Sequence, residues 1–319
     1  MPVLVLVEHA GGKPSDLSLQ ALTLARSLAG GEPLHALLVG GADAAPALGA
    51  YGVAVAHVAE HAGLDSFAPD AWAAALSALV ARLAATVVVA AASDRGADVM
   101  ARLAARQGLP LAANCSSARP GPPLVVTRLR WGGSLLEEAI VHSPLALLTV
   151  AAHAVQAEPA PTPASAELRR FTPELTDQDL AVRVAEHVPA PGGGVSLKDA
   201  KVVVSGGRGV GSREGFAIIE ELAGLLGAAV GCSRAVTSAG WRPHTDQVGQ
   251  TGTKIAPDIY IACGISGATQ HMAGCKAAKR ILAINSDAEA SIMADADYAV
   301  IGDLKEIVPA ISAEIRRQR

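Results

Sequence analysis

The chain has 319 residues, of which 50% are hydrophobic and 3% aromatic, and its formal net charge is −4. This length exceeds the usual size of one domain, so we expect two. The slightly negative charge gives no reason to expect a nucleic-acid partner.

The cysteines and the apolar runs constrain the class of protein further. The four cysteines are Cys115, Cys232, Cys263 and Cys275. They lack the spacing of a metal site and form no CxxC pair, so we expect reduced thiols in a cytoplasmic protein. The apolar residues 3–7 follow no basic segment and end at Glu8, which predicts a strand rather than a signal peptide. No apolar run reaches the about 20 residues that cross a bilayer, so no membrane insertion is expected.

In the first half of the chain, short apolar runs alternate with segments of helical spacing. This alternation predicts an α/β domain with a mostly parallel sheet. The expected strands are residues 3–7, 34–39, 53–58 and 86–90, and the expected helices are residues 15–28, 70–83 and 93–107. Ser15 and Ser93 are the expected N-caps of two helices, which end near Gly30 and Gly108.

The segment Ser93-Asp94-Arg95-Gly96 allows two interpretations. A capped helix that follows a strand can form an anion or cofactor site. The simpler interpretation, which we favour, is an ordinary N-cap followed by a solvated Arg95.

The pattern changes after Leu124. Residues 125–130, 135–142 and 145–150 are expected to be partly antiparallel strands that complete the sheet, and the Pro/Ala-rich residues 156–166 are expected to be an exposed loop. Residues 168–171 and 180–188 are expected to be short strands that return to the first domain. Pro189 to Gly194 predicts the domain boundary, with a swivel there as a hypothesis.

The second half contains four apolar runs, each followed by a polar tip rich in turn residues. The runs are residues 202–204, 228–230, 259–262 and 281–284. They predict a parallel sheet with crossover helices, whose carboxyl edge is where such sheets bind ligands. The side chains expected to converge there are Arg208, Ser233, Arg234, Ser266, His271, Asn285 and Asp303. Glycines and free helix N–H groups at this edge suit a large phosphorylated cofactor.

The glycine-rich residues 205–212 match neither of two common phosphate-binding motifs. A Walker loop requires Lys where this chain has Ser212, so ATP hydrolysis is disfavoured. The dinucleotide motif GxGxxG lacks its third glycine at the same position, which also disfavours an NAD fold.

Six sequence blocks in the second half resemble one known family. The blocks are Ser-Gly-Gly-Arg-Gly at 205–209, Cys-Ser-Arg-Ala at 232–235, Gln-Val-Gly-Gln-Thr-Gly at 247–252, Gly-Ile-Ser-Gly-Ala-Thr-Gln-His at 264–271, Ala-Ile-Asn at 283–285 and Gly-Asp-Leu at 302–304. They resemble the FAD-binding domain of the electron transfer flavoprotein alpha subunit. The resemblance implies an N-terminal scaffold domain at 1–190 that packs on a beta subunit, and a C-terminal, doubly wound, parallel-sheet FAD-binding domain at 195–319.

The resemblance also implies which residues contact FAD. They are Arg208, Ser233, Arg234, Val248, Gly249, Gln250, Thr251, Ser266, Gly267, Ala268, Thr269, Gln270, His271, Asn285, Asp303 and Leu304. Arg208 suits a phosphate or the adenosine, because a guanidinium donates two parallel hydrogen bonds. Arg234 lies beside the flavin ring in the family, where its permanent charge favours the reduced, negatively charged flavin. His271 then donates a hydrogen bond to the pyrimidine end of the ring.

The remaining roles also follow from the resemblance. Thr251 bonds the N5 region of the flavin, and Gln250 meets the ribityl chain or the ring edge. Residues 266–270 open a helix whose N–H groups meet the pyrophosphate. Asn285 and Asp303 are suited to the adenosine. Without the resemblance, His271 is more typical of a core or helix face, and Arg234 of a surface ion pair.

The resemblance implies a redox carrier rather than an enzyme. Its partners are a beta subunit that completes a heterodimer and holds AMP, and acyl-CoA or related dehydrogenases that donate electrons. A quinone oxidoreductase then receives the electrons singly, as in fatty acid beta-oxidation. Two alternatives stay open: a flavin- or NAD-dependent oxidoreductase with His271 as acid/base, and a scaffold without a cofactor. Trp241 to Asp246 and Thr269 depart from the family pattern.

Overall fold

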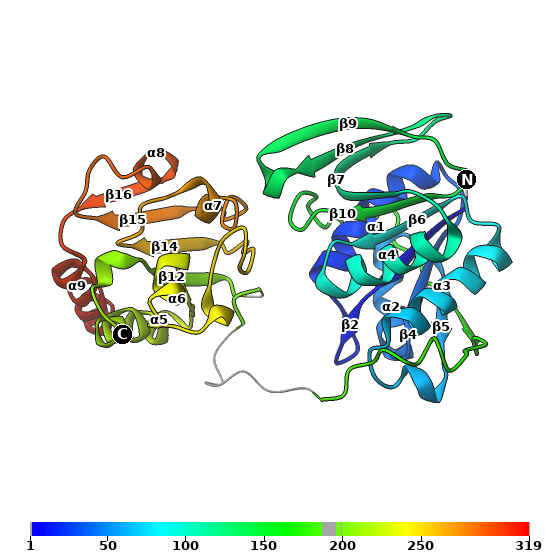
Figure 1. Ribbon diagram of the computed structural model, residues 1–319, viewed down its shortest axis with the longest axis horizontal. Coiled ribbons are helices and arrows are strands. Elements are labelled where there is room, and N and C mark those ends of the chain that lie inside the picture. The colour runs from blue at the N-terminus through cyan, green and yellow to red at the C-terminus, as the bar shows by residue number, and fades with distance from the viewer. Residues whose placement is uncertain (1, 187–195, 199, 319) are drawn as a thin grey trace. The chain divides into compact units, whose positions relative to one another are not determined.

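The structure is a computed structural model, and it describes residues 2–186, 196–198 and 200–318. The chain divides into two compact units, Met1–His187 and Val188–Arg319 (Figure 1). Each unit is α/β with its own largely parallel sheet, as the sequence predicted. The expected boundary at residues 189–194 lies outside the described residues.

The N-terminal unit is built on a nine-stranded sheet with the order β11-β5-β4-β1-β6-β10-β7-β8-β9. The strands are β1 (Val3–Val7), β4 (Leu34–Val39), β5 (Val53–Ala59), β6 (Val87–Ala91), β7 (Leu111–Arg119), β8 (Leu124–Arg130), β9 (Leu135–Val141), β10 (Ala146–Val150) and β11 (Glu167–Phe171). Only the pairs β7–β8 and β8–β9 are antiparallel. A small hairpin of β2 (His9–Ala10) and β3 (Lys13–Pro14) lies outside this sheet.

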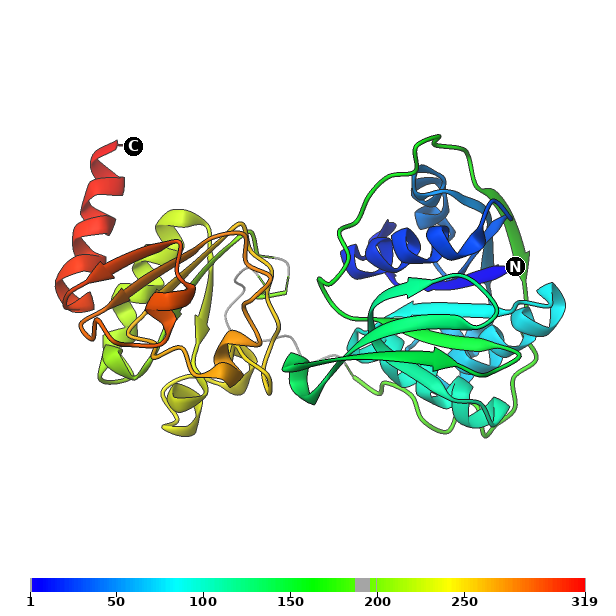
Figure 2. The ribbon, with the colours of Figure 1, turned by 90° about the horizontal axis from the view of Figure 1, so that it is seen from above.

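Alternate residues of the central strands enter two separate cores. In β1, Val3 and Val5 pack toward α1 (Asp16–Ala29), whereas Leu4 and Leu6 pack toward α3 (Pro69–Leu83) and α4 (Asp94–Gln107). Figure 2 shows the strands between α1, in blue, and the cyan helices of the other face. The helices are α1 (Asp16–Ala29), α2 (Ala45–Leu48), α3 (Pro69–Leu83) and α4 (Asp94–Gln107). Strands buried on both faces explain the continuous apolar runs of the sequence.

The predicted helix caps are present. Ser15 Oγ accepts a hydrogen bond from Ser18 N, and α1 ends at Gly30 in the left-handed conformation. Ser93 Oγ accepts from Gly96 N, which confirms an ordinary N-cap for α4. Arg95, however, is not simply solvated, because its guanidinium lies 5.1 Å from the centroid of the Phe67 ring.

One strand of this unit was missed, and one expected strand was wrong. The sequence did not predict β7, whose polar residues show no continuous apolar run. Residues 180–186 do not form the expected strand, and residues 187–188 lie outside the described residues. Val184 N donates to the Phe67 carbonyl (2.8 Å), but no ladder forms along the described part of this segment. Leu180 instead packs against the core next to α3 and α4.

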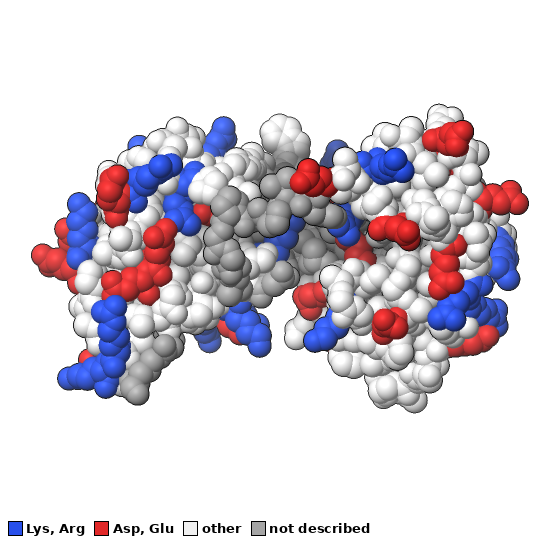
Figure 3. Space-filling model, turned by 90° about the horizontal axis from the view of Figure 1, so that it is seen from below, with Lys and Arg blue, Asp and Glu red and all other residues white. Residues whose placement is uncertain are grey.

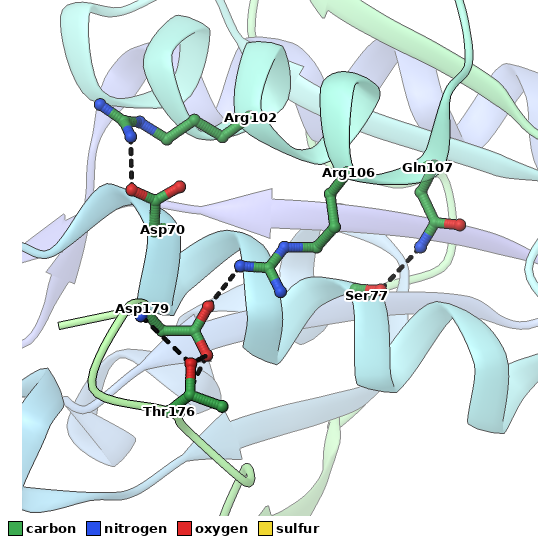
Figure 4. A network of polar contacts seen from close by, with 7 residues as sticks. All are labelled: Asp70, Ser77, Arg102, Arg106, Gln107, Thr176 and Asp179. Atoms are coloured by element: carbon green, nitrogen blue, oxygen red, sulfur yellow. Dashed lines mark hydrogen bonds and ion pairs between the residues drawn. The ribbon is translucent and has the colours of Figure 1, made fainter. Parts of the chain in front are cut away.

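Polar contacts connect α4 to its neighbours (Figure 4). They are Arg102 to Asp70, Arg106 to Asp179, and Gln107 Nε2 to Ser77 Oγ (2.7 Å). Asp179 is only 4% exposed and also accepts from Thr176 N (2.9 Å) and Thr176 Oγ1 (2.7 Å). Burial acts to raise the pKa of Asp179, but these hydrogen bonds outweigh it, so the pKa lies below its usual value.

The Asp179 carboxylate is expected to stabilise the protein only where it is charged. Its folded pKa is depressed, so the contribution is present above the unfolded pKa of about 3.9 and disappears as the pH falls through the folded value. We expect Asp179→Asn to lower the free energy of unfolding by about 1.5 to 3 kcal/mol at pH 7. Urea unfolding at pH 7 and pH 3 checks this, with the more exposed Asp98→Asn as control. An equal loss of unfolding free energy in Asp179→Asn at both pH values would contradict a depressed pKa of Asp179 in the folded protein.

The C-terminal unit has a five-stranded, wholly parallel sheet with the order β13-β12-β14-β15-β16. The strands are β12 (Val202–Gly206), β13 (Ala229–Cys232), β14 (Ile259–Cys263), β15 (Ile281–Asn285) and β16 (Tyr298–Ile301). The helices are α5 (Ala217–Leu226), α6 (Arg234–Ser238), α7 (Thr269–Met272), α8 (Ile292–Asp295) and α9 (Leu304–Gln318). Helices α5 and α9 cover one face, and α7 and α8 lie on the other. All four predicted strands are confirmed.

The loops after β12 and β14 approach each other backbone to backbone. Gly207 N donates to Cys263 O (2.8 Å), and Gly209 N donates to Gly264 O (3.2 Å). A Cβ atom on Gly207 would lie 2.1 Å from the carbonyl oxygen of Gly264. Glycine at 207 therefore allows the two loops to pack at this distance.

Gly207→Ala is expected to lower the free energy of unfolding by about 1 to 3 kcal/mol, because a backbone carbonyl cannot move aside as a side chain can. Gly224→Ala is the matched control. A Cβ there, in the last turn of α5, meets no atom within 4 Å. The control should be neutral or stabilise by up to about 1 kcal/mol. Equal denaturation midpoints for the two variants would show that the loops after β12 and β14 can move apart without a loss of stability.

The surface carries charges of both signs, as the small net charge leads one to expect, and the cysteines are free thiols. Lys and Arg side chains alternate with Asp and Glu on the visible face of each unit (Figure 3). All four cysteines are buried free thiols, and burial raises the pKa of each to about 12, which makes them poorly reactive. Among the described helices, none is long and apolar enough to span a bilayer.

Candidate functional site

A cavity of ≈ 390 Å³ opens at the carboxyl edge of the C-terminal sheet, lined by the loops that follow β12, β13, β14 and β15. The chain leaves β12 toward β13 on one side and continues to β14 on the other, so a topological switch point lies here. The predicted residues that line the cavity are Arg208, Ser233, Arg234, Val248, Gly249, Gln250, Thr251, Ser266, Ala268, Gln270, His271 and Asn285. The predicted residues outside this lining, in the described chain, are Gly267, Thr269, Asp303 and Leu304.

The residues outside the lining have structural contacts of their own. Asp303 Oδ1 accepts from Lys305 N (2.9 Å) and so caps α9. Leu304 is buried beneath the Gly209 and Gly264 loops. Gly267 packs against Ile292, where a Cβ would lie 2.3 Å from the backbone nitrogen. These residues support the walls of the cavity.

The expected contribution of helix N-termini is small. Helix α7 begins at Thr269 rather than at Ser266 and has four residues, and α6 has five. Helix α5 begins only at Ala217, after two 3-10 turns. One-turn helices carry little macrodipole, and the glycines of the tips delay helix formation. The backbone N–H groups and side chains of loops therefore form most of this site.

Two cavity guanidiniums are available to a ligand. Arg208 and Arg234 are exposed, and in the described part of the chain neither forms an ion pair with a carboxylate. Arg242, from the segment that departs from the family pattern, is different. It contacts Glu220 and Asp246 and lies 5.6 Å from the centroid of the Phe216 ring, so it anchors its loop to α5.

Sequence reasoning missed Gln247, which is 2% exposed and lines the cavity. Gln247 Nε2 donates to Thr251 Oγ1 (2.9 Å), and Gln247 Oε1 accepts from Thr237 Oγ1 (2.6 Å). Thr251 Oγ1 accepts this bond and donates to no acceptor among the described residues, so its proton is available to a ligand. Gln247 belongs to the block 247–252, whose first residue was quoted but not assigned a role.

A residue that sequence reasoning also missed holds the His271 ring in the cavity wall. Its Nε2 lies 2.7 Å from the hydroxyl of Tyr260, which is fully buried in β14. Its Nδ1 is buried and makes no hydrogen bond with the described residues. Burial lowers the pKa of His271 to about 4, although the Val248 carbonyl acts to raise it. The ring is therefore neutral at pH 7.

Asn285 connects two loops of the site. Its Nδ2 donates to Ile265 O (3.0 Å), and its Oδ1 accepts from Asp287 N (3.1 Å). One N–H and one lone pair remain for a ligand, so the amide can shape the cavity and contact its content at once.

The fold and the cavity are typical of an α/β protein that binds a flavin or a nucleotide. Open loops meet at a switch point, and they carry polar donors and two guanidiniums that form no ion pair with the described carboxylates. No group of three or more metal-ligating side chains occurs among the described residues. Comparison with known proteins identifies the family within this class. Residues 3–176 match the electron transfer flavoprotein domain, and residues 196–276 match the electron transfer flavoprotein FAD-binding domain.

Relatives align with nearly the whole chain. The chain is 40% identical to electron transfer flavoprotein subunit alpha of Mycobacterium tuberculosis over 320 residues, 99% of each protein. It is 35% identical to the subunit of the same name from Bacillus subtilis over 318 residues, 99% of this chain and 97% of that protein. The chain belongs to the electron transfer flavoprotein alpha-subunit family, and its cofactor is FAD.

The cavity residues fit FAD on three observations. His271 Nδ1 is a buried polar atom without a hydrogen-bond partner in the described chain, as expected where a ligand completes the pairing. The Thr251 hydroxyl retains a free proton. Both unpaired guanidiniums suit the negative charges of a dinucleotide. The resemblance in the sequence is thereby confirmed at the level of the family and the cofactor.

Proposed function

We propose that the chain is the FAD-binding subunit of a heterodimeric electron carrier. A beta subunit completes the site and holds AMP, acyl-CoA or related dehydrogenases supply electrons, and a quinone oxidoreductase accepts them singly. The buried free thiols agree with a cytoplasmic carrier. The observation that carries the proposal is the convergence of Arg234, Thr251 and His271 in one cavity of a member of this family.

Bound FAD supplies the electron-accepting group, and this chain binds and tunes it. Arg234 presents a permanent positive charge, Thr251 a hydroxyl and His271 a neutral ring, and all three line the cavity. Arg208, Ser266 and Asn285 line the cavity from the loops after β12, β14 and β15. We assign Arg234, Thr251 and His271 to the flavin ring. Arg208, Ser266 and Asn285 are assigned to the phosphates and the adenosine.

The alternative function, a flavin- or NAD-dependent oxidoreductase, requires His271 to act as a general base. A general base works best with a pKa near the working pH. Burial lowers the pKa of His271 to about 4, and Tyr260 lies within hydrogen-bond distance of Nε2. These observations favour a hydrogen-bonding role over proton abstraction.

The test is to co-express the full chain with a beta subunit and to record the visible spectrum of the purified complex. A yellow complex that is reduced by an acyl-CoA dehydrogenase with its substrate, and reoxidised by a quinone oxidoreductase, is the expected result. A colourless complex would instead favour a scaffold protein without a cofactor. Release of a chemically altered small molecule by the chain alone would favour the enzyme.

A further inference from the structure

Tyr260 is a large polar side chain with no exposed surface, on the strand directly beneath the cavity. Its hydroxyl lies 2.7 Å from Nε2 of His271, and the two rings are tilted by 32°. Ser205 Oγ is also buried and comes close enough to lower the pKa of the phenol, without the geometry of a hydrogen bond. A buried phenol is unusual unless its hydroxyl has a partner, and His271 is that partner.

The neutral His271 ring has one N–H, and the hydrogen bond at one nitrogen decides which nitrogen carries it. Burial raises the pKa of Tyr260 well above its ordinary value, so the phenol keeps its proton. If the phenol donates to Nε2, the ring proton lies on Nδ1.

We propose that Tyr260 is a positioning residue whose hydroxyl donates to His271 Nε2, which fixes the ring proton on Nδ1 and makes Nδ1–H the donor to the cofactor in the cavity. The inference rests on the proposed function in one respect, the contact between His271 and the flavin. The tautomer itself depends only on this chain.

The geometry makes Nδ1 the available atom. Nε2 is used by Tyr260, whereas Nδ1 is buried, makes no hydrogen bond among the described residues, and belongs to a side chain that lines the cavity. A buried donor without a partner is unfavourable, so a ligand acceptor that meets Nδ1–H gains a strong interaction. Without the Tyr260 hydroxyl, the proton can move to Nε2, and Nδ1 would then present a lone pair to the same acceptor.

The first measurement is the tautomer of His271 in the full chain with its partner, with and without FAD, by nitrogen NMR of histidine-labelled protein. We expect a protonated Nδ1 and an unprotonated Nε2 in both samples. Tyr260→Phe, which removes only the hydroxyl, should give a mixture of tautomers. Tyr298→Phe is the matched control, since Tyr298 is 59% exposed in the same unit. A protonated Nε2 in the unaltered protein would overturn the proposal, even if the variant fails to fold.

The second measurement is the redox titration of the FAD-loaded complex. Tyr260→Phe should weaken the preference for reduced flavin about tenfold, which is about 59 mV for one electron. The same substitution in a His271→Ala background should have no further effect, because the hydroxyl acts only through the ring. An equal effect in both backgrounds would show a role in packing and overturn the proposal. A changed tautomer with an unchanged potential would instead reject the contact between His271 and the flavin.

Discussion

The Arg234→Ala variant is expected to lower the midpoint potential of the bound flavin by roughly 65 to 130 mV for one electron. Arg234 lines the cavity, is exposed, and forms no ion pair with a carboxylate among the described residues. A guanidinium stays charged at any working pH, so it stabilises the negatively charged, reduced flavin more than the oxidised one. A charge-assisted hydrogen bond contributes about 1.5 to 3 kcal/mol, which gives this range. A redox titration of the FAD-loaded complex measures it.

Two further variants make this result specific. Arg234→Lys keeps the charge but loses the planar fork, so its potential should lie between those of the other two proteins. Arg208→Ala removes the other unpaired guanidinium of the cavity and should weaken FAD retention with little change in potential. An unaltered titration for Arg234→Ala, or an equal shift in Arg208→Ala, would remove Arg234 from the flavin ring.

The strands of the C-terminal sheet could be predicted because they are buried on both faces. Val202 to Val204 and Ile281 to Ile284 are continuous apolar runs, and each ends where a polar tip begins. In a parallel sheet such tips meet at one edge, so short patterns in the sequence were enough to bring Arg208 and Asn285 to the same cavity.

Helix starts and peripheral segments were predicted less well. Helical spacing indicated a helix from Ser266, yet the first turn begins at Thr269, since Gly267 adopts a left-handed φ of 82°. Residues 180–186 alternate like a strand, but a strand also requires a partner edge, which a local pattern does not reveal. Strand β7 escaped prediction because tertiary pairing, rather than apolar periodicity, holds its polar residues.

The side chains that orient the site were the hardest to predict. Tyr260 lies 11 positions from His271 and is one apolar-looking residue within a strand. Its role depends on the approach of α7 to the hydroxyl, which only the fold supplies. Gln247 was within reach of sequence reasoning, because it is four residues from Thr251 in a quoted block.

Asn285→Ala is expected to weaken FAD retention about 5- to 150-fold with little change in the visible spectrum. The amide bridges the loops after β14 and β15 through Ile265 O (3.0 Å) and Asp287 N (3.1 Å). We propose that the remaining N–H and lone pair of the amide bind the adenosine. Loss of two such hydrogen bonds amounts to about 1 to 3 kcal/mol, and each 1.4 kcal/mol is a tenfold change in affinity. The spectrum should persist because we place Asn285 at the adenosine, away from the flavin ring. Dialysis against buffer, followed by flavin fluorescence, measures the retention.

The same variant separates direct contact from loop shaping. If the amide mainly holds the two loops together, Asn285→Ala also lowers the thermal stability of the FAD-free complex, and retention and stability fall in parallel. If its remaining N–H and lone pair bind the adenosine, FAD retention falls by more than the loss of stability of the FAD-free complex accounts for. The exposed neighbour Ser286 lies outside the cavity lining, so Ser286→Ala should leave both quantities unchanged. FAD affinity equal to that of the unaltered protein would count against any role of Asn285 at the adenosine.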